Sequence, residues 1–303
     1  MKFARVCVAL GAAAGALAAA VEASSSAGST FTYEVVTGIF KQDDPTIPPA
    51  EIGATPASFG LIDESPLRWL KLKAKILSLN LFAPRNTQYK LLFLGRHGEG
   101  WHNVAEAFYG TPAWDETWSK LDGNGTIVWG PDAQLTPLGE AQAANVTLLW
   151  EKELQAGIPI PEILYSSPMS RAAKTARISF EWLWKTGKRA LILENFREVI
   201  GVHTCDERKT KTYIREQFGD IMNIERGFTE QDELWTADHR ETNDEQNVRL
   251  KKALDFVFSH GGTYVSVTAH SGALNAAFRV MGHRDYSIPT GGVVPVLLKA
   301  IKA

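Results

Sequence analysis

The sequence predicts an α/β protein, a three-layer α/β/α sandwich around a mostly parallel central sheet with inserted cap segments. Short apolar runs that suit strands alternate with longer stretches of helical periodicity, which is typical of a parallel sheet covered by helices. Two long segments, 98–135 and 200–242, interrupt this alternation, and such excursions build the ligand crevice in open α/β sheets. With 303 residues, 45% of them hydrophobic, the chain is long enough for one large core or for a core with an inserted cap.

The predicted strands are short and apolar. The clearest is 89–95, whose continuous apolar run suits a strand buried on both faces. The other predicted strands are 162–167, 190–194, 263–270 and 293–300. Pro295 has no N–H for a ladder hydrogen bond, so it predicts an edge position or a bulge in the last strand.

Helices precede and separate these strands. An irregular lead-in over 24–60 is followed by a helix that Ser65 and Pro66 open. Three more amphipathic helices are predicted over 136–157, 167–187 and 243–261. The last of them is capped by Asn243 or Asp244.

The N-terminus predicts a secretory signal peptide over residues 1–23. Two basic residues precede an Ala-rich apolar run over 6–20, and small residues follow, with cleavage expected near 20–23. The run is short and weakly apolar for a transmembrane helix, so a retained signal anchor is the less favoured alternative. We therefore expect a secreted protein with a single domain over 24–303 and no membrane partner after cleavage.

Charge and cysteine content narrow the class of protein. The 32 basic and 34 acidic side chains argue against a nucleic-acid binder driven by net charge. Signal cleavage leaves only Cys205, so no intramolecular disulfide is possible and the core must supply the stability. Asn124 and Asn145 begin sequons, which makes the mature chain a candidate glycoprotein.

Polar clusters follow three of the predicted strands at their carboxyl ends. They read "GRHGEGWHN", "SSPMSR" and "AHSG". Because the carboxyl ends of parallel strands meet at one rim of a sheet, we expect these clusters to converge. The converging set is Arg96, His97, Arg171 and His270.

This set suits a phosphate better than a metal ion. Arginine repels a cation, and two histidines are too few for a closed zinc shell. Guanidinium groups match phosphate oxygens in bidentate fashion, and imidazoles add donors. A neutral imidazole there can also attack phosphorus and form a covalent phosphohistidine. Gly95 and Gly98 would let the backbone approach the phosphate closely.

The ordered motifs resemble those of the histidine phosphatase superfamily, the phosphoglycerate mutase-like proteins. The resemblance covers Tyr89 to Ala300 and is carried by "LGRHGEGWHN", "LTPLGEAQA", "YSSPMSRAAKTA", "REVIGVHTCDER" and "VTAHSG". The RHGxGxHN and CDxR patterns are similar to those of fungal and plant phosphoglycerate mutase-like proteins. The resemblance implies a phosphoglycerate mutase-like fold and chemistry without a metal or an organic cofactor.

The resemblance also implies roles for the matching residues. His97 matches the nucleophile, and Arg96, Arg171 and His270 match the phosphate pocket. Asn103 matches a position whose side chain often contacts the transferred phosphate.

Glu198 matches the family's general acid, which protonates the leaving oxygen and later helps water attack. A related branch carries His-Asp after the last strand, whereas Ser271 follows His270 here. Glu198 is therefore the better candidate for the proton donor.

Three features stay open at the level of sequence. Arg208, in the CDER motif, either reaches the rest of the substrate or belongs to a structural hinge. His102 either lines the pocket or caps the following helix. The four tryptophans of segment 98–135 favour a small core in the cap over a substrate cage.

We expect a phosphatase that hydrolyses a small phosphorylated substrate through a phosphohistidine on His97, with Glu198 as general acid. The alternatives are a phosphoglycerate mutase, and a catalyst or binding protein of this fold recruited to secondary metabolism. No nucleic-acid partner is expected, and no oligomeric state is predicted.

Overall fold

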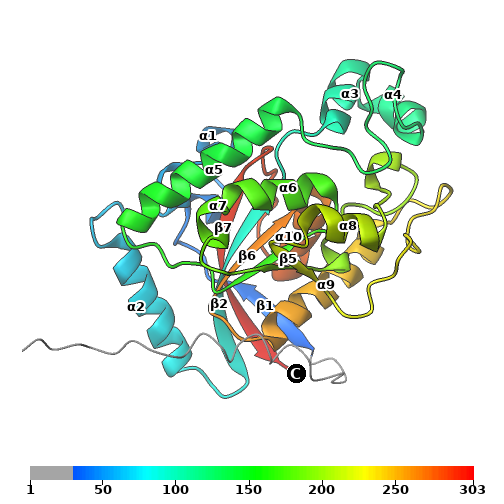
Figure 1. Ribbon diagram of the computed structural model, residues 1–303. Helices are drawn as coiled ribbons and strands as arrows, with labels where there is room; N and C mark the ends of the chain where they lie inside the picture. The colour runs from blue at the N-terminus through cyan, green and yellow to red at the C-terminus, as the bar shows by residue number, and fades with distance from the viewer. Residues whose placement is uncertain (1–29) are drawn as a thin grey trace, which may run out of the picture.

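The computed structural model describes residues 30–303, and the predicted signal peptide over 1–23 lies outside them. Its centre is a seven-stranded sheet in the order β1-β7-β2-β6-β3-β4-β5 (Figure 1). The strands are β1 (Phe31–Val35), β2 (Thr87–Arg96), β3 (Ile163–Ser166), β4 (Ala190–Ile192), β5 (Met222–Ile224), β6 (Tyr264–Ala269) and β7 (Val293–Lys302). Only β7 runs antiparallel to its neighbours in this sheet of residues 30–303, so the prediction of a mostly parallel sheet is confirmed.

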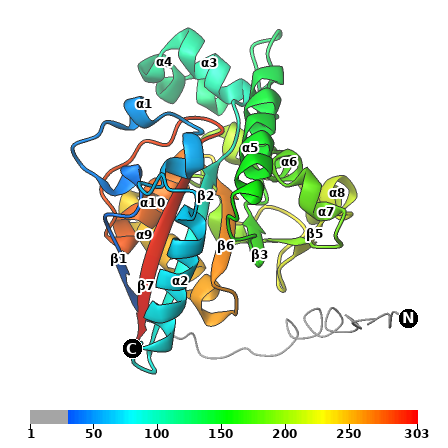
Figure 2. The ribbon, with the colours of Figure 1, turned by 90° about the vertical axis from the view of Figure 1, so that its left-hand side faces the viewer.

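Helices cover both faces of the sheet (Figure 2). The α-helices of the described residues are α1 (Pro49–Ile52), α2 (Arg68–Leu81), α3 (Trp101–Tyr109), α4 (Thr111–Glu116), α5 (Pro137–Gln155), α6 (Ser170–Ser179), α7 (Glu181–Trp184), α8 (Lys211–Phe218), α9 (Asn243–Ser259) and α10 (Ser271–Met281). Within residues 30–303, no helix combines the length and the apolar character needed to cross a bilayer.

Two hydrophobic cores, one on each face of the sheet, hold the three layers together. Leu91 and Phe93 of β2 belong to the core under α2, α5, α6 and α8. Leu92 and Leu94, which point to the opposite face, belong to the core under α9 and α10. The continuous apolar run of β2 is therefore explained by burial on both faces, as predicted.

Most predicted elements are present, with differences at their ends. All five predicted strands form, while β1 and β5 were not predicted. Residues 31–35 form β1, so the lead-in over 24–60 is not irregular throughout. The predicted helix over 167–187 is divided at Phe180 into α6 and α7. The N-cap of α9 is Thr242, whose hydroxyl accepts from the N–H of Glu245, and not Asn243 or Asp244.

The edge position predicted for Pro295 holds at that residue only: β7 as a whole lies between β1 and β2, but β1 does not extend to Pro295. Pro295 is opposite Phe93 on β2. The N–H of Arg96 donates to the carbonyl of Gly292, and alternation along an antiparallel ladder then directs the Pro295 nitrogen away from β2. On that other side β1 pairs only as far as Leu298. The missing N–H therefore removes no ladder hydrogen bond.

Segment 98–135 leaves the sheet after β2 and forms α3 and α4, which Figure 1 shows at one end of the molecule. Trp114 and Trp129 are buried in a small cluster with Ala105 and Ala133. Cys205, from segment 200–242, completes this cluster. The prediction of a small core in the cap is confirmed for these two tryptophans, and that core joins the two excursions.

Candidate active site

The carboxyl ends of β2, β3 and β6 meet at one rim of the sheet (Figure 1). The N–H of His97 donates to the carbonyl of Ala269 at 3.0 Å, which joins the end of β2 to the end of β6. The ring centroids of His97 and His270 lie 5.1 Å apart. Nε2 of His270 lies 2.7 Å from the hydroxyl of Ser167, just beyond β3. The structure thus brings together the three polar clusters that were expected to converge.

The backbone next to His97 selects the tautomer of its imidazole. Nδ1 lies 2.6 Å from the carbonyl oxygen of Gly98. Because a carbonyl oxygen only accepts, Nδ1 carries the proton and the neutral ring has its lone pair on Nε2. Burial, assisted by the charges of Arg171 and Arg96, lowers the pKa of His97 well below its ordinary value. The arrangement therefore favours a neutral imidazole with a nucleophilic Nε2.

Gly98 is required by packing rather than by the room it gives to an anion. A Cβ at this position would lie 2.1 Å from the carbonyl oxygen of Gly139, in the first turn of α5. A Cβ on Gly139 would in turn lie 2.1 Å from the carbonyl oxygen of Glu99. The N–H of Gly98 donates to the hydroxyl of Thr175 on α6 at 3.0 Å. The loop after His97 is therefore held between α5 and α6.

Arg171 is fully buried, and the CDER motif holds it in place. Nη1 donates to the carbonyl of Cys205 at 2.6 Å, and Nη2 donates to Oδ1 of Asp206 at 2.7 Å. Arg240 donates to the other carboxylate oxygen of Asp206 at 2.9 Å. Although burial acts to raise the pKa of Asp206, Arg240 and Arg171 hold it below its usual value. Asp206 is thus a carboxylate that positions a pocket arginine.

Both arginines of the rim keep unused donors. The Nε atoms of Arg96 and Arg171 are buried without a hydrogen-bond partner within residues 30–303. Nη1 of Arg96 donates to the carbonyl of Ile288 at 2.8 Å. Since a buried N–H without a partner costs free energy, spare donors on two neighbouring guanidinium groups indicate a site for an anion.

The pocket does not favour a charged His270 before an anion binds. Its Nδ1 is buried and has no partner in the described part of the chain. Burial first, and then the charges of Arg171 and His97, lower the pKa of His270 well below its ordinary value. A cationic His270 therefore requires a negative ligand that offsets those charges.

Glu198 lies over the N-terminus of α10, next to the end of β6. Its carboxylate accepts from the N–H groups of Val199, Gly272 and Ala273 at 3.0, 3.1 and 3.0 Å. A Cβ on Gly272 would lie 2.3 Å from Oε1 of Glu198, so this position must be glycine for the carboxylate to sit there. The first turn of α10 therefore fixes Glu198 beside the residue that follows His270.

The side chain of Asn103 caps α3. Its Oδ1 accepts from the N–H of Gly100 at 3.0 Å, which leaves the amide Nδ2 without a hydrogen bond within residues 30–303. Because Gly100 and Asn103 form the cap, the helix-capping interpretation of His102 is wrong. The ring of His102 instead lies with its centroid 5.4 Å from that of His97.

Arg208 does not lie with its donors free for a substrate. Nε donates to both carboxylate oxygens of Glu194, at 3.0 and 3.1 Å. The four Nη hydrogens have acceptors on residues 209 and 229–231. The guanidinium also lies 4.2 Å from the ring centroid of Phe228. All five donors are used within the protein, so the structural-hinge alternative replaces the substrate-binding one.

Comparisons with known proteins agree with this geometry. The family model described as "Histidine phosphatase superfamily (branch 1)" matches residues 92–289. The chain belongs to the histidine phosphatase superfamily. The match runs from inside β2 to the loop before β7, and therefore includes every strand end that forms the rim.

Relatives within this superfamily carry mutase names. A protein of Arthroderma benhamiae described as "Probable phosphoglycerate mutase" is 43% identical, covering 88% of this chain and 84% of its own length. "Phosphomutase-like protein 3" of Candida albicans is 34% identical, covering 86% of this chain and 77% of its own length.

A solved structure titled as mycobacterial glucosyl-3-phosphoglycerate phosphatase has a TM-score of 0.36 at 19% identity, covering 63% of this chain and 78% of that one.

Several residues of this histidine phosphatase site were not found from the sequence. Ser167 meets His270, and Asp206 with Arg240 holds Arg171. Asp132 accepts from both the N–H and the hydroxyl of Ser170, at 2.9 and 2.6 Å, at the start of α6. Burial raises the pKa of Asp132 to about 6. Ser167 and Asp206 lie inside recognised motifs, whereas nothing in the sequence marks Asp132 as a partner of α6.

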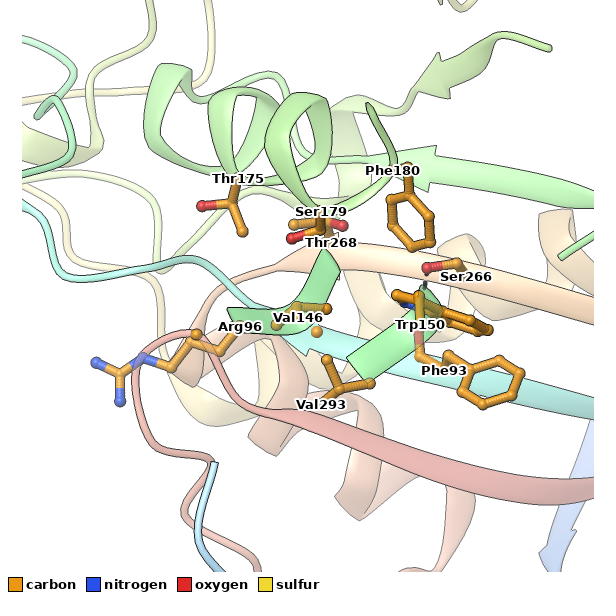
Figure 3. A pocket seen from close by; sticks show the side chains of 12 residues that line it. Phe93, Arg96, Val146, Trp150, Thr175, Ser179, Phe180, Ser266, Thr268 and Val293 are labelled. Atoms are coloured by element: carbon orange, nitrogen blue, oxygen red, sulfur yellow. Dashed lines mark hydrogen bonds between the residues drawn. The ribbon is translucent and has the colours of Figure 1, made fainter. Parts of the chain in front are cut away.

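A cavity of about 10 Å³, the space of roughly one water molecule, lies behind the rim. Figure 3 shows Thr175, Ser179 and Thr268 around it, with the guanidinium of Arg96 directed away. The cavity therefore belongs to the layer between the sheet and α6. It is not the space in which the histidines meet.

One cluster in the caps has the residue types of a metal site. His203, Cys205 and Asp206 have ligand atoms within 4.8 Å of one another. Both carboxylate oxygens of Asp206 accept hydrogen bonds from arginines, at 2.7 and 2.9 Å. Two guanidinium groups on one ligand repel a cation, so these residues do not fit a metal ion.

Proposed function

We propose that this chain is a phosphatase that hydrolyses phosphate monoesters through a covalent phosphohistidine on His97. The observation that carries the proposal is the neutral, buried His97 with its free Nε2 beside two guanidinium groups that keep unused donors. Such donors stabilise the charge that spreads over the equatorial oxygens during phosphoryl transfer. Splitting hydrolysis into two transfers replaces one difficult step by two easier ones.

In the first step, the lone pair of His97 Nε2 attacks phosphorus and the bond from phosphorus to the ester oxygen breaks. The protonated carboxyl of Glu198 gives its proton to the leaving oxygen, which departs as an alcohol. Arg96 and Arg171 bind the transferred oxygens, and His270 donates to them once the anion favours its charged form. The amide Nδ2 of Asn103 is available as a further donor.

In the second step, water attacks phosphorus of the phosphohistidine and the bond between phosphorus and nitrogen breaks. The carboxylate of Glu198 accepts the proton of the attacking water, so it returns to its starting form. Inorganic phosphate leaves, and the lone pair returns to Nε2 of His97. No metal or organic cofactor takes part in the proposal.

A His97→Ala variant tests the proposal. We expect the purified wild-type chain to hydrolyse an aryl phosphate, and the variant to lose on the order of 10³-fold in kcat or more. His239→Ala is the matched control, because this histidine is 62% exposed and pairs with Glu245 outside the rim. Equal rates for wild type and His97→Ala would overturn the assignment.

Trapping of the intermediate separates catalysis from simple binding. Rapid acid-free quenching of wild type with a ³²P-labelled ester is expected to leave label on His97, located by peptide mapping. A binding protein of this fold would retain the ligand without any covalent label. If no covalent label is found, the chain would be a non-hydrolytic binding protein and the phosphatase proposal would be rejected.

A phosphoglycerate mutase is the second candidate, favoured by the names of the relatives at 43% and 34% identity. A mutase must protect its phosphoenzyme from water and return the phosphoryl group to another oxygen of the same substrate. Incubation with 3-phosphoglycerate, followed by ³¹P NMR, distinguishes the two reactions. Release of inorganic phosphate supports the phosphatase, and 2-phosphoglycerate without release supports the mutase.

We further propose that the protein is secreted, on the basis of the signal-like pattern of residues 1–23. Expression in a eukaryotic secretory host is expected to yield protein in the medium that begins near residues 21–24. N-terminal sequencing measures this directly. Full-length protein that stays inside the cells would contradict the proposal.

A further inference from the structure

Helix α2 has apolar side chains on two faces, and only one of them packs on the protein. Trp69, Leu72 and Ile76 are buried in the core over the sheet. Leucines on the outer face recur at helical spacing and are exposed, together with the residues just outside each end of the helix. They are Leu67 (57% exposed), Leu70 (57%), Leu77 (68%), Leu81 (71%) and Phe82 (80%).

Every charged side chain on α2 itself is basic. Lys73 lies beside the leucines on the helix surface, and Lys75 lies farther round the helix from them. Lys71 pairs at 3.2 Å with Asp63, a residue that precedes the helix. Between Glu64 and Glu99 the sequence contains no acidic residue. The outer face of α2 is therefore both apolar and basic.

The position of α2 leaves this face accessible while the rim faces elsewhere. Figures 1 and 2 both show α2 on the outside of the molecule, with its C-terminal end at the opposite end from α3 and α4. A surface that covers the stripe would not cover the strand ends that carry the histidines. The catalytic site would stay open to water.

We propose that α2 docks the protein on an anionic lipid bilayer, which replaces the expectation that no membrane partner remains after signal cleavage. In this arrangement the helix lies in the plane of the interface, with Leu70, Leu77 and Leu81 inserted at the boundary of the acyl chains. Lys73 and Lys75 extend to the headgroup level, where negative lipids attract them. Phe82 continues the apolar surface past the end of the helix.

Charge favours a lipid surface over a second copy of this chain. Face-to-face packing of two α2 helices would bury their leucines but would also bring the lysines of one copy beside those of the other. No acidic side chain on α2 can pair with them. Repulsion between the lysines of the two facing copies opposes association, whereas anionic headgroups attract the same lysines.

Vesicle co-sedimentation of the purified full chain tests the proposal. The probes are phosphatidylcholine vesicles with and without phosphatidylserine, at low and at high salt. We expect binding only to the vesicles that contain phosphatidylserine, weakened by salt. The triple variant Leu70→Gln/Leu77→Gln/Leu81→Gln and the double variant Lys73→Glu/Lys75→Glu are each expected to lose about tenfold in partitioning.

The matched control carries the same kinds of substitution on another exposed helix surface. Leu148→Gln/Lys152→Glu on α5, where Leu148 is 62% exposed, should bind as wild type does. Circular dichroism melting checks folding without reference to catalysis, so loss of phosphatase activity and loss of docking are separate results. If the leucine variant unfolds, the lysine variant alone decides the test.

Three outcomes would overturn docking through α2. Wild type that stays in the supernatant with both kinds of vesicle would exclude it. Equal binding by wild type and both α2 variants would assign the binding to another part of the chain. Light scattering that shows a dimer, converted to a monomer by the leucine variant, together with no vesicle binding, would assign the stripe to self-association.

Discussion

The rim at the strand ends and the loop around Arg208 both bury arginines, but the two regions use them differently. In the rim, Arg171 is fully buried and only two of its five N–H groups donate within residues 30–303. In the loop, Arg208 is 4% exposed and all five of its N–H groups have acceptors. Burial and charge are therefore alike in the two regions. Between these two arginines, the difference lies in the number of N–H groups that remain free to bind a ligand.

Among the variants that test this comparison, the largest expected effect comes from Arg171→Lys. A lysine keeps the charge but cannot hold Asp206 and still present a planar pair of donors to a phosphate. We expect kcat/KM for an aryl phosphate to fall by about 10² to 10³, the cost of losing one fixed donor in comparable sites. Arg177→Lys, on the exposed side of the same helix, is the control and should keep wild-type kinetics. A mild effect of Arg171→Lys would remove the distinction between the two regions.

Arg208→Ala should act on stability rather than on substrate binding. It removes the Arg208 donors from Glu194 and from four backbone carbonyls, which we expect to lower the free energy of unfolding by about 3 kcal/mol. KM of the folded variant should stay at the wild-type value. Denaturant unfolding and steady-state kinetics on the same preparation measure both quantities. A raised KM with unchanged stability would restore Arg208 to the substrate site.

A smaller effect, on stability, is expected when a glycine near the rim is replaced by alanine. Gly98→Ala places a Cβ against the backbone of Gly139, so we expect about 2 kcal/mol of destabilisation and a fall in kcat as His97 shifts. Gly95→Ala is the matched change, because its Cβ would meet Val267 at an ordinary 3.6 Å. Thermal melting should separate the two variants clearly. Similar melting of both would show that the loop is not held as described.

The smallest expected effect is a pH dependence of stability that originates in the rim. Burial lowers the pKa values of His97, His102 and His270 well below the ordinary 6.5. Unfolding returns them to about 6.5, so the unfolded chain takes up protons below that pH. Their contribution to stability is complete above about pH 6.5 and is lost as the pH falls toward the lowered values.

Denaturant unfolding at several pH values measures this effect. His102→Gln should reduce the slope of the unfolding free energy against pH, by at most about 1.4 kcal/mol per pH unit. His239→Ala, on an exposed histidine, should leave the slope unchanged. An unchanged slope in His102→Gln would mean that this ring is charged in the folded protein.

The sequence predicts those strands and helices whose own residue pattern shows which of their faces are buried. Leu91 to Leu94 form a continuous apolar run because both faces of β2 are covered, and this pattern needs no knowledge of the partner strands. Strand β1 alternates in burial and contains Glu34, so its pairing with β7 is what makes it a strand. A three-residue strand such as β5 is too short to carry a pattern at all.

In the candidate site, too, the sequence predicts some features and misses others. Arg96, His97, Arg171 and His270 could be grouped because the carboxyl ends of parallel strands share a rim. Which donors of an arginine are already used depends on acceptors far away in sequence, as with the Thr229 and Gln231 carbonyls on Arg208. The lowered pKa of His270 likewise depends first on burial and then on Arg171, which follows another strand end. Sequence spacing carries neither kind of information.

The hydrogen bond from His97 to the carbonyl of Gly98 has a consequence for how this protein can diversify. A main-chain oxygen sets which nitrogen of His97 is free, and no side-chain substitution can delete a main-chain oxygen. Segments 98–135 and 200–242 can therefore accumulate changes that alter which ligand enters, while the same nitrogen of His97 stays free. Proteins that diverge from this chain are therefore expected to change in ligand specificity before they change in the reactive atom of His97.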